Sequence, residues 1–170
     1  EKTLSPDVIK RVMQRWTGDF DGMVERRVIR VLVAYSKTFY FVDKGTQRGT
    51  AYDGLKSFEE QINKKLKTGN IQIQVIFIPV SRDDLFPGLV EGRGDIAAAS
   101  LTITPQRKQV VDFTEPLLKG VSEIVVTGPE SPRISTLDDL AGQVIVVRKS
   151  SSYHESLVNL NREFARRGKP

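Results

Sequence analysis

The sequence predicts an α/β fold built on a mostly parallel sheet, and three features of the 170-residue chain support this prediction. Short apolar segments rich in β-branched residues recur along the chain. They alternate with amphipathic segments of helical period, and the connections between them are short. Strands and helices that alternate in this way are typical of right-handed crossovers between parallel strands.

The first 27 residues form a leader of mixed character. Ser5 and Pro6 are residues that commonly start helices, so we expect a short helix there, which residues 17–19 end. The nearly continuous apolar run at 28–34 then predicts a strand that is covered on both faces.

Turn-forming residues at 44–49 precede a helix whose apolar side chains repeat every three or four positions. These side chains are Leu55, Phe58, Ile62 and Leu66. Gly69 and Asn70 end this helix, and residues 71–78 predict the second strand.

A further helix and a third strand are expected between residues 81 and 99. Ser81 and Asp84 have the spacing of a capping box. The helix that they begin carries Leu85, Leu89 and Val90. Residues 92–94 close it, and the small residues of 95–99 predict a third strand.

The same pattern begins again in the last third of the chain. Residues 122–127 and 144–148 predict strands, and Ser135 with Asp138 is expected to cap a short helical turn. Ser151 or Ser152 is expected to cap a final helix. Its apolar side chains are Leu157, Leu160 and Phe164.

Composition excludes several classes of function. The chain has no Cys and one His, which excludes a disulfide framework, a thiol nucleophile and zinc sites of several thiolates or imidazoles. The net charge of +5 is spread along the chain, and no aromatic residues interleave the basic run at 64–67, so we predict no nucleic-acid partner. We also predict no metal and no cofactor. No apolar run approaches the ~20 residues that span a membrane.

Candidate ligand-binding residues follow the predicted strands, because ligands of open parallel sheets bind beyond the carboxyl ends of the strands. The first strand leads into a segment rich in rings, which include Tyr35, Phe39 and Tyr40. These rings either pack in the core or form a wall beside a small ligand.

The third strand leads into the hydroxyl-rich segment Ser100-Leu101-Thr102. Thr104 and Pro105 are expected to begin a helix, which places Arg107 in its first turn, where a cation is disfavoured by the helix dipole. Hydroxyl groups, free backbone N–H groups and a guanidinium at one place suit a carboxylate. The alternative is a surface Arg107 paired with Asp112 or Glu115.

The third candidate segment, Lys149-Ser150-Ser151-Ser152, offers hydroxyl groups beside a cation, although a plain serine cap explains it equally well. Catalytic patterns are weak. His154 stands alone, and the pairs at 83–84 and 138–139 fall in first turns of helices, where carboxylates are expected for structural reasons.

Two stretches, residues 91–107 and 111–116, closely resemble the extracellular solute-binding proteins of family 3, and Tyr52-Asp53 and residues 137–142 extend the likeness. The resemblance implies the fold of the type II periplasmic binding proteins, with lobes of three layers, αβα, around a mostly parallel sheet. It divides the chain into a leader (1–27), an incomplete first lobe (28–117) and the first part of a truncated second lobe (118–170).

In this family a ligand is held between two lobes. The resemblance implies that Arg107 binds the α-carboxylate, that Ser100 and Thr102 add contacts, and that Ser150 and Ser151 face the ligand from the second lobe. Two positions depart from the family pattern: Ala34 replaces the usual acidic residue, and Lys149 stands where Gly is common. Because of these departures, the resemblance does not imply that the chain recognises a free α-amino group.

The leader and residues 35–43 further resemble the regulatory half of the membrane-bound lytic murein transglycosylases. This resemblance implies a non-catalytic periplasmic module that senses an amino acid, short peptide or muropeptide and regulates a catalytic domain outside this chain, which a longer protein attaches to the cell envelope membrane. The alternative is an amino-acid receptor of an ABC transporter. An enzyme acting through His154 is a third hypothesis, and the exposed edges of a partial lobe suggest a dimer.

Overall fold

The computed structural model describes residues 6–169, so the expected helix-starting role of Ser5 lies outside the described residues. The chain divides between Asp112 and Phe113 into two compact units, each considered by itself below. The predicted lobe boundaries at 28–117 and 118–170 stay a prediction.

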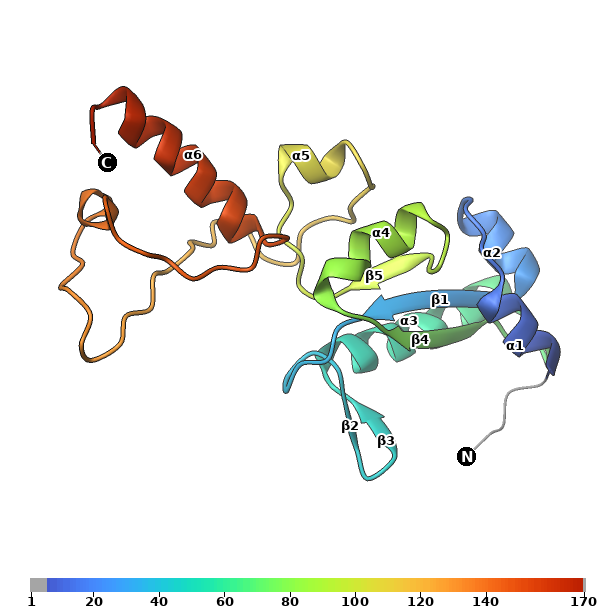
Figure 1. Ribbon diagram of the computed structural model, residues 1–170. Coiled ribbons are helices and arrows are strands. Elements are labelled where there is room, and N and C mark those ends of the chain that lie inside the picture. The colour runs from blue at the N-terminus through green and yellow to red at the C-terminus, as the bar shows by residue number, and fades with distance from the viewer. Residues whose placement is uncertain (1–5, 170) are drawn as a thin grey trace. The chain divides into compact units, whose positions relative to one another are not determined.

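The first unit is built on a parallel sheet of three strands in the order β4-β1-β5 (Figure 1). The strands are β1 (Val28–Val33), β4 (Gln74–Pro79) and β5 (Ile96–Ala98). Val31 of β1 lies opposite Phe77 on one side and Ile96 on the other. Every residue of β1 is buried because this strand is central and covered on both faces. The α/β prediction is confirmed, although the second strand begins at Gln74 and not at residue 71.

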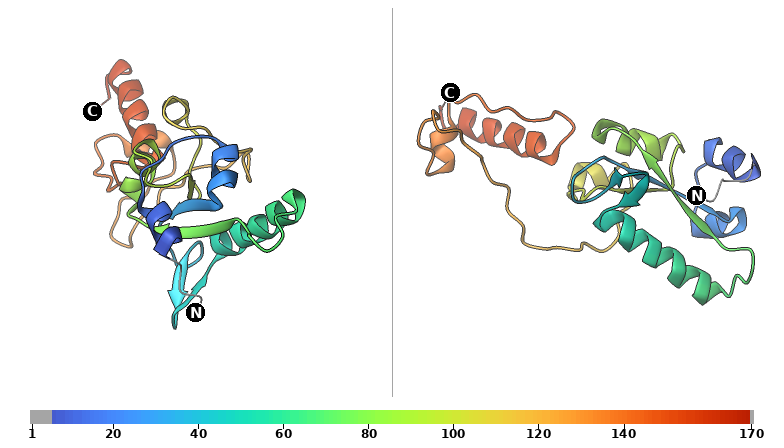
Figure 2. Two further views of the ribbon diagram at one scale, coloured as in Figure 1. Left: turned by 90° about the vertical axis from the view of Figure 1, so that its right-hand side faces the viewer. Right: turned by 90° about the horizontal axis from the view of Figure 1, so that it is seen from below.

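Two helices cover opposite faces of this sheet (Figure 2). Alternate β1 residues Ile29, Val31 and Val33 pack in one cluster with Ile62 of α3 (Thr50–Leu66). On the other face, Leu32 and Ala34 cluster with Leu85 of α4 (Leu85–Val90). Both helices were predicted, but Leu66 and Val90 at their ends are exposed.

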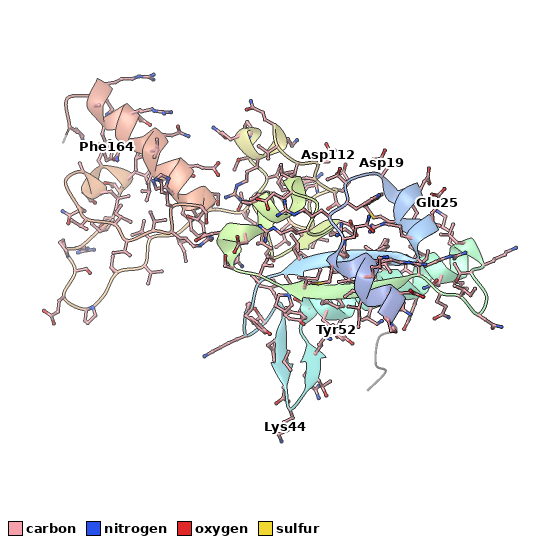
Figure 3. All side chains as sticks on the ribbon, turned by 45° about the vertical axis from the view of Figure 1, so that its right-hand side comes forward. Asp19, Glu25, Lys44, Tyr52, Asp112 and Phe164 are labelled. Carbon is pink, nitrogen blue, oxygen red and sulfur yellow. The ribbon has the colours of Figure 1, made fainter. Side chains whose placement is uncertain are left out.

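Two elements of the first unit were not predicted. One is α2 (Phe20–Arg26), which follows the expected helix α1 (Pro6–Met13), and both contact β1. The other is a hairpin of β2 (Phe41–Asp43) and β3 (Thr46–Arg48), and Figure 3 shows Lys44 at its tip. The tip residues Lys44 and Gly45 both have positive φ, as a two-residue hairpin turn of type I′ requires.

A buried charge cluster ties the leader to the sheet. Arg30 and Asp95 have fully buried side chains, and Arg30 Nη2 lies 2.7 Å from Asp95 Oδ1. The same guanidinium donates to the main-chain carbonyls of Gln14 (2.6 Å) and Trp16 (3.0 Å). Arg26 adds a second cation 3.0 Å from Asp95. The leader is therefore part of the first unit's fold.

The second unit contains η2 (Leu137–Leu140, a 3₁₀ helix) and α6 (Ser152–Arg166). The strands predicted at 122–127 and 144–148 are wrong: no described residue of these segments is in a strand. Val144 and Val146 are 94% and 97% exposed. A β-branched sequence becomes a strand only when a neighbour completes its hydrogen bonds, and the described residues of this unit give neither segment one.

Side-chain contacts hold η2 in place. The prediction of a cap by Ser135 and Asp138 is off by one position: the Asp139 carboxylate accepts the N–H groups of Ser135 (2.9 Å) and Thr136 (2.8 Å). Asp138 instead pairs with Arg167 (2.6 Å) and Lys169 (2.7 Å), beyond the end of α6. Hydrogen bonds from these two cations lower the pKa of Asp138 to about 2.

Among residues 6–169, no helix has the length and apolar character needed to cross a bilayer.

Candidate ligand site

The carboxyl ends of β4, β1 and β5 meet at one edge of the first unit's sheet, because the three strands are parallel. This edge is the place where the sequence analysis predicts a ligand. The segments that leave it carry rings after β1, a short helical turn after β4 and hydroxyl groups after β5.

The rings after β1 have different surroundings. Tyr40 is 2% exposed, its ring lies 5.7 Å from that of Phe77, and its hydroxyl donates to Gln47 Oε1 (3.1 Å). Burial, followed by the neighbouring phenols of Tyr35 and Tyr52, raises the pKa of Tyr40. Tyr40 is thus a core residue in this structure, as one of the two interpretations expected. Tyr35 is exposed, and Phe39 is half-buried.

The segment after β5 turns sharply at Ser100, which has a φ of 49° in the left-handed region. This conformation costs a residue with a Cβ roughly 1 kcal/mol. Ser100 and Thr102 are exposed, whereas Leu101 packs against the cluster of Leu32 and Leu85. The turn therefore anchors one apolar side chain and presents two hydroxyl-bearing residues to solvent.

The helix α5 (Pro105–Lys108) begins as predicted, since the Thr104 hydroxyl accepts the N–H of Arg107 (3.3 Å). Arg107 is 8% exposed, so the interpretation as a surface residue is wrong. Its Nη1 donates to the Thr102 carbonyl (3.1 Å), and its Cζ lies 5.1 Å from the Phe86 ring centroid. A buried guanidinium is thus held between a main-chain carbonyl and an aromatic face.

Sequence reasoning missed a second arginine at this edge. Arg82, in η1 (Arg82–Asp84, a 3₁₀ helix), donates from Nη2 to the Ala99 carbonyl (3.1 Å). Ser81 and Arg82 directly follow the end of β4. Their position after a strand end is the signal that points to them, as it does for the segments after β1 and β5.

In the second unit, Ser151 is confirmed as the N-cap of α6. Its hydroxyl accepts the N–H of His154 (3.3 Å) and donates to the Arg148 carbonyl (2.5 Å). Ser151 and Ser152 are buried, while Ser150 is exposed and contacts Arg148. The capping interpretation accounts for Ser151, and ligand contacts by Ser150, Ser151 and Ser152 stay a prediction.

Comparison with known proteins gives a family match over most of the chain. The model of the bacterial extracellular solute-binding proteins, family 3, matches residues 29–167. Proteins named membrane-bound lytic murein transglycosylase F are 32% identical over 141 residues in Pseudomonas fluorescens and 32% over 129 residues in Desulfosudis oleivorans. The matches cover 82% and 76% of this chain but only 27% and 26% of those proteins.

An amino-acid-binding protein, AabA of Dichelobacter nodosus, is 26% identical over 81% of this chain and 50% of its own. Among solved structures, an ancestral amino-acid-binding protein, a precursor of cyclohexadienyl dehydratase, matches with a TM-score of 0.64 and 26% identity, covering 82% of this chain and 60% of that one. An ancestral arginine-binding protein bound to arginine matches with a TM-score of 0.57 and 27% identity, covering 80% and 57%.

Proposed function

Because the chain belongs to family 3 of the bacterial extracellular solute-binding proteins, we propose that it is a non-catalytic module that binds a small molecule bearing a carboxylate. The proposed site is the carboxyl edge of the first unit's sheet. Arg107 binds the carboxylate there, and Ser100 and Thr102 contribute hydrogen bonds. Tyr35 and Phe39 are the rings proposed to contact the ligand. Tyr40 is buried in the core, and the proposed site does not require its contact with the ligand.

The observation that carries the proposal is the burial of Arg107 at this edge. Its Nη1 bond to Thr102 and the ring of Phe86 fix the orientation of the guanidinium. A planar guanidinium held in one orientation suits a carboxylate, which accepts two parallel N–H groups. Electrostatic attraction is also stronger away from bulk water.

The proposed ligand is an amino acid, a short peptide or a muropeptide. Names of relatives support two parts of this choice: some are amino-acid-binding proteins and others are lytic murein transglycosylases. We further propose that ligand binding regulates a transglycosylase domain outside these residues, in the periplasm. The region shared with this chain is about a quarter of each transglycosylase. The link between this chain and transglycosylase activity is therefore part of the proposal.

Calorimetry of the full chain with a panel of amino acids and alanyl dipeptides tests the site. Arg107→Ala is expected to weaken binding by ~2–5 kcal/mol, as for truncation of one partner of a buried charge pair. Arg93→Ala is the matched control, because Arg93 pairs with Glu91 (3.1 Å) and Asp84 (3.6 Å) on the surface. Unchanged affinity in Arg107→Ala places the ligand elsewhere.

A transporter receptor is the second candidate, favoured by the match to AabA over half of that protein's length. The two candidates differ in what responds to the ligand. A sensor changes the rate at which an attached transglycosylase domain cleaves glycan strands, whereas a receptor stimulates ATP hydrolysis by a membrane transporter. Assay of both activities with and without the ligand found by calorimetry separates them.

A further inference from the structure

We propose that Arg82 is a second cation of this ligand site, so that the ligand carries a second anionic group besides the carboxylate assigned to Arg107. The inference rests on the proposed function, because it concerns the same edge of the sheet. It narrows the ligand to dicarboxylic amino acids and acidic peptides.

The backbone around Arg82 is fixed at the carboxyl edge. The N–H of Val80 donates to the Val33 carbonyl (2.8 Å), so the chain still follows β1 beyond the end of β4. The Ser81 hydroxyl then donates to the Asp84 carboxylate (2.7 Å) and accepts the Asp84 N–H (3.2 Å). Arg82 therefore starts from a braced turn.

The side chain of Arg82 spans the sheet edge. The strand order is β4-β1-β5, and Arg82 reaches from the exit of β4 to the Ala99 carbonyl at the exit of β5. It must therefore pass the end of β1, where Ala34 is small, buried and without a polar group. One N–H of the guanidinium is used on Ala99, and a half-buried cation is left at the predicted ligand position.

Two connections bring Arg82 near Arg107. Both guanidinium groups donate to carbonyls of the same short turn, those of Ala99 and Thr102. These carbonyls are three residues apart, which limits their separation to about 11 Å. In addition, Phe86 lies one helical turn after Arg82, and its ring contacts the Arg107 guanidinium.

No carboxylate among the described residues neutralises the charge of Arg82. Within residues 6–169, no carboxylate lies at ion-pair distance from Arg82, although Arg93 pairs with Asp84 and Glu91 and Arg30 pairs with Asp95. Two neighbouring cations repel each other, and an anion between them removes that repulsion. An acidic ligand is thus better matched to this edge than a neutral one.

Calorimetry with two isosteric dipeptides, alanyl-glutamate and alanyl-glutamine, tests the inference on the full chain, using each enantiomer of the second residue. The wild type is expected to bind the glutamate form roughly ten- to a hundred-fold more tightly, the range for one charge-assisted hydrogen bond. Arg82→Gln should reduce this ratio to near one. Arg82→Lys, which keeps the charge, should restore part of it.

The ratio is measured within each variant, so a general loss of folded protein weakens both dipeptides equally and does not imitate the expected result. Arg93→Gln removes the same charge from an arginine that pairs with Asp84 of η1 and with Glu91, and it should keep the wild-type ratio. An unchanged ratio in Arg82→Gln, or equal affinities in the wild type, overturns the role of Arg82 and leaves the proposed function intact. Binding of neither dipeptide by the wild type overturns both the inference and the peptide ligand of the proposed function.

Discussion

Two buried arginines in the first unit differ in what surrounds them. Arg30 is 0% exposed, and its guanidinium bonds the Asp95 carboxylate and two carbonyls of the leader. Arg107 is 8% exposed at the carboxyl edge, where it bonds the carbonyl of its own turn and lies against Phe86. Burial by itself therefore does not distinguish a structural arginine from a ligand-binding one. The position relative to the sheet does: Arg30 lies inside the central strand β1, whereas Arg107 follows the carboxyl end of β5.

The largest effect on stability is expected from Asp95→Asn, because it leaves the fully buried Arg30 without its counter-charge. Breaking a buried pair on one side costs about 3–5 kcal/mol. Chemical denaturation monitored by circular dichroism measures the change. If this variant loses less than about 1 kcal/mol, Arg30 is not the structural arginine described above.

The next effect concerns the packing of the leader around Trp16. A Cβ at Gly22 would lie 2.6 Å from the Trp16 ring, which is covered by the Arg26 guanidinium at 3.7 Å. Gly22→Ala is expected to destabilise the chain by about 1–3 kcal/mol through overpacking. Gly54→Ala is the matched control: nothing lies within 4 Å of its added methyl in the interior of α3, so it should stabilise the chain by up to about 1 kcal/mol. A stable Gly22→Ala protein would show that the leader is loosely held.

A smaller effect on stability is expected from Arg107→Ala. It removes the hydrogen bond to the Thr102 carbonyl and the cation–π contact with Phe86, and the loss of these two contacts costs about 1–2 kcal/mol. Chemical denaturation of this variant and of Asp95→Asn distinguishes the two arginines. Asp95→Asn is expected mainly to lower the free energy of unfolding, whereas Arg107→Ala is expected mainly to lower the affinity for the ligand. A loss in Arg107→Ala as large as in Asp95→Asn would make both arginines structural.

The smallest effect concerns the exposed ion pairs of Asp138 in the second unit. Its pKa is lowered to about 2 from 3.8 by Arg167 and Lys169, so its stabilising contribution is complete above pH 3.8 and disappears as the pH falls to about 2. Titration of the Asp138 carboxyl by nuclear magnetic resonance, with the Arg167 side-chain signals followed in parallel, checks this. Asp138→Asn should remove the response of Arg167 near pH 2, and a midpoint near 4 for the wild-type Asp138 would show that its ion pairs do not form.

Strong local patterns allowed much of the fold to be predicted. The apolar run at 28–34 gave the buried central strand, and Thr104 with Pro105 gave the start of α5. The strands at 122–127 and 144–148 failed because their residues favour strands, but no described neighbour pairs with them. A strand forms only when a second segment pairs with it, and the composition of one segment does not show whether such a partner is present.

The candidate site was predictable where one residue's position decides its role. Arg107 followed from its place after Thr104. Arg82 follows the end of β4 and so carries a positional signal too, but its contact with the Ala99 carbonyl, 17 residues away in the sequence, is set by the fold. The position of Arg30 within a run of apolar residues also predicts a buried partner of opposite charge, because a buried guanidinium needs one. Which acid supplies that partner, Asp95, is set by the parallel pairing of β1 and β5.

The most direct test of the central claim is a nuclear magnetic resonance titration that follows the Nε–H signals of Arg30 and Arg107 while the tightest ligand from the calorimetric panel is added. The Arg107 signal is expected to shift until the site is saturated, with the Arg30 signal unchanged, because the Arg30 guanidinium is already occupied by Asp95 and the leader. Saturating shifts elsewhere in the chain with no change at Arg107 would contradict the assignment of this arginine to the ligand.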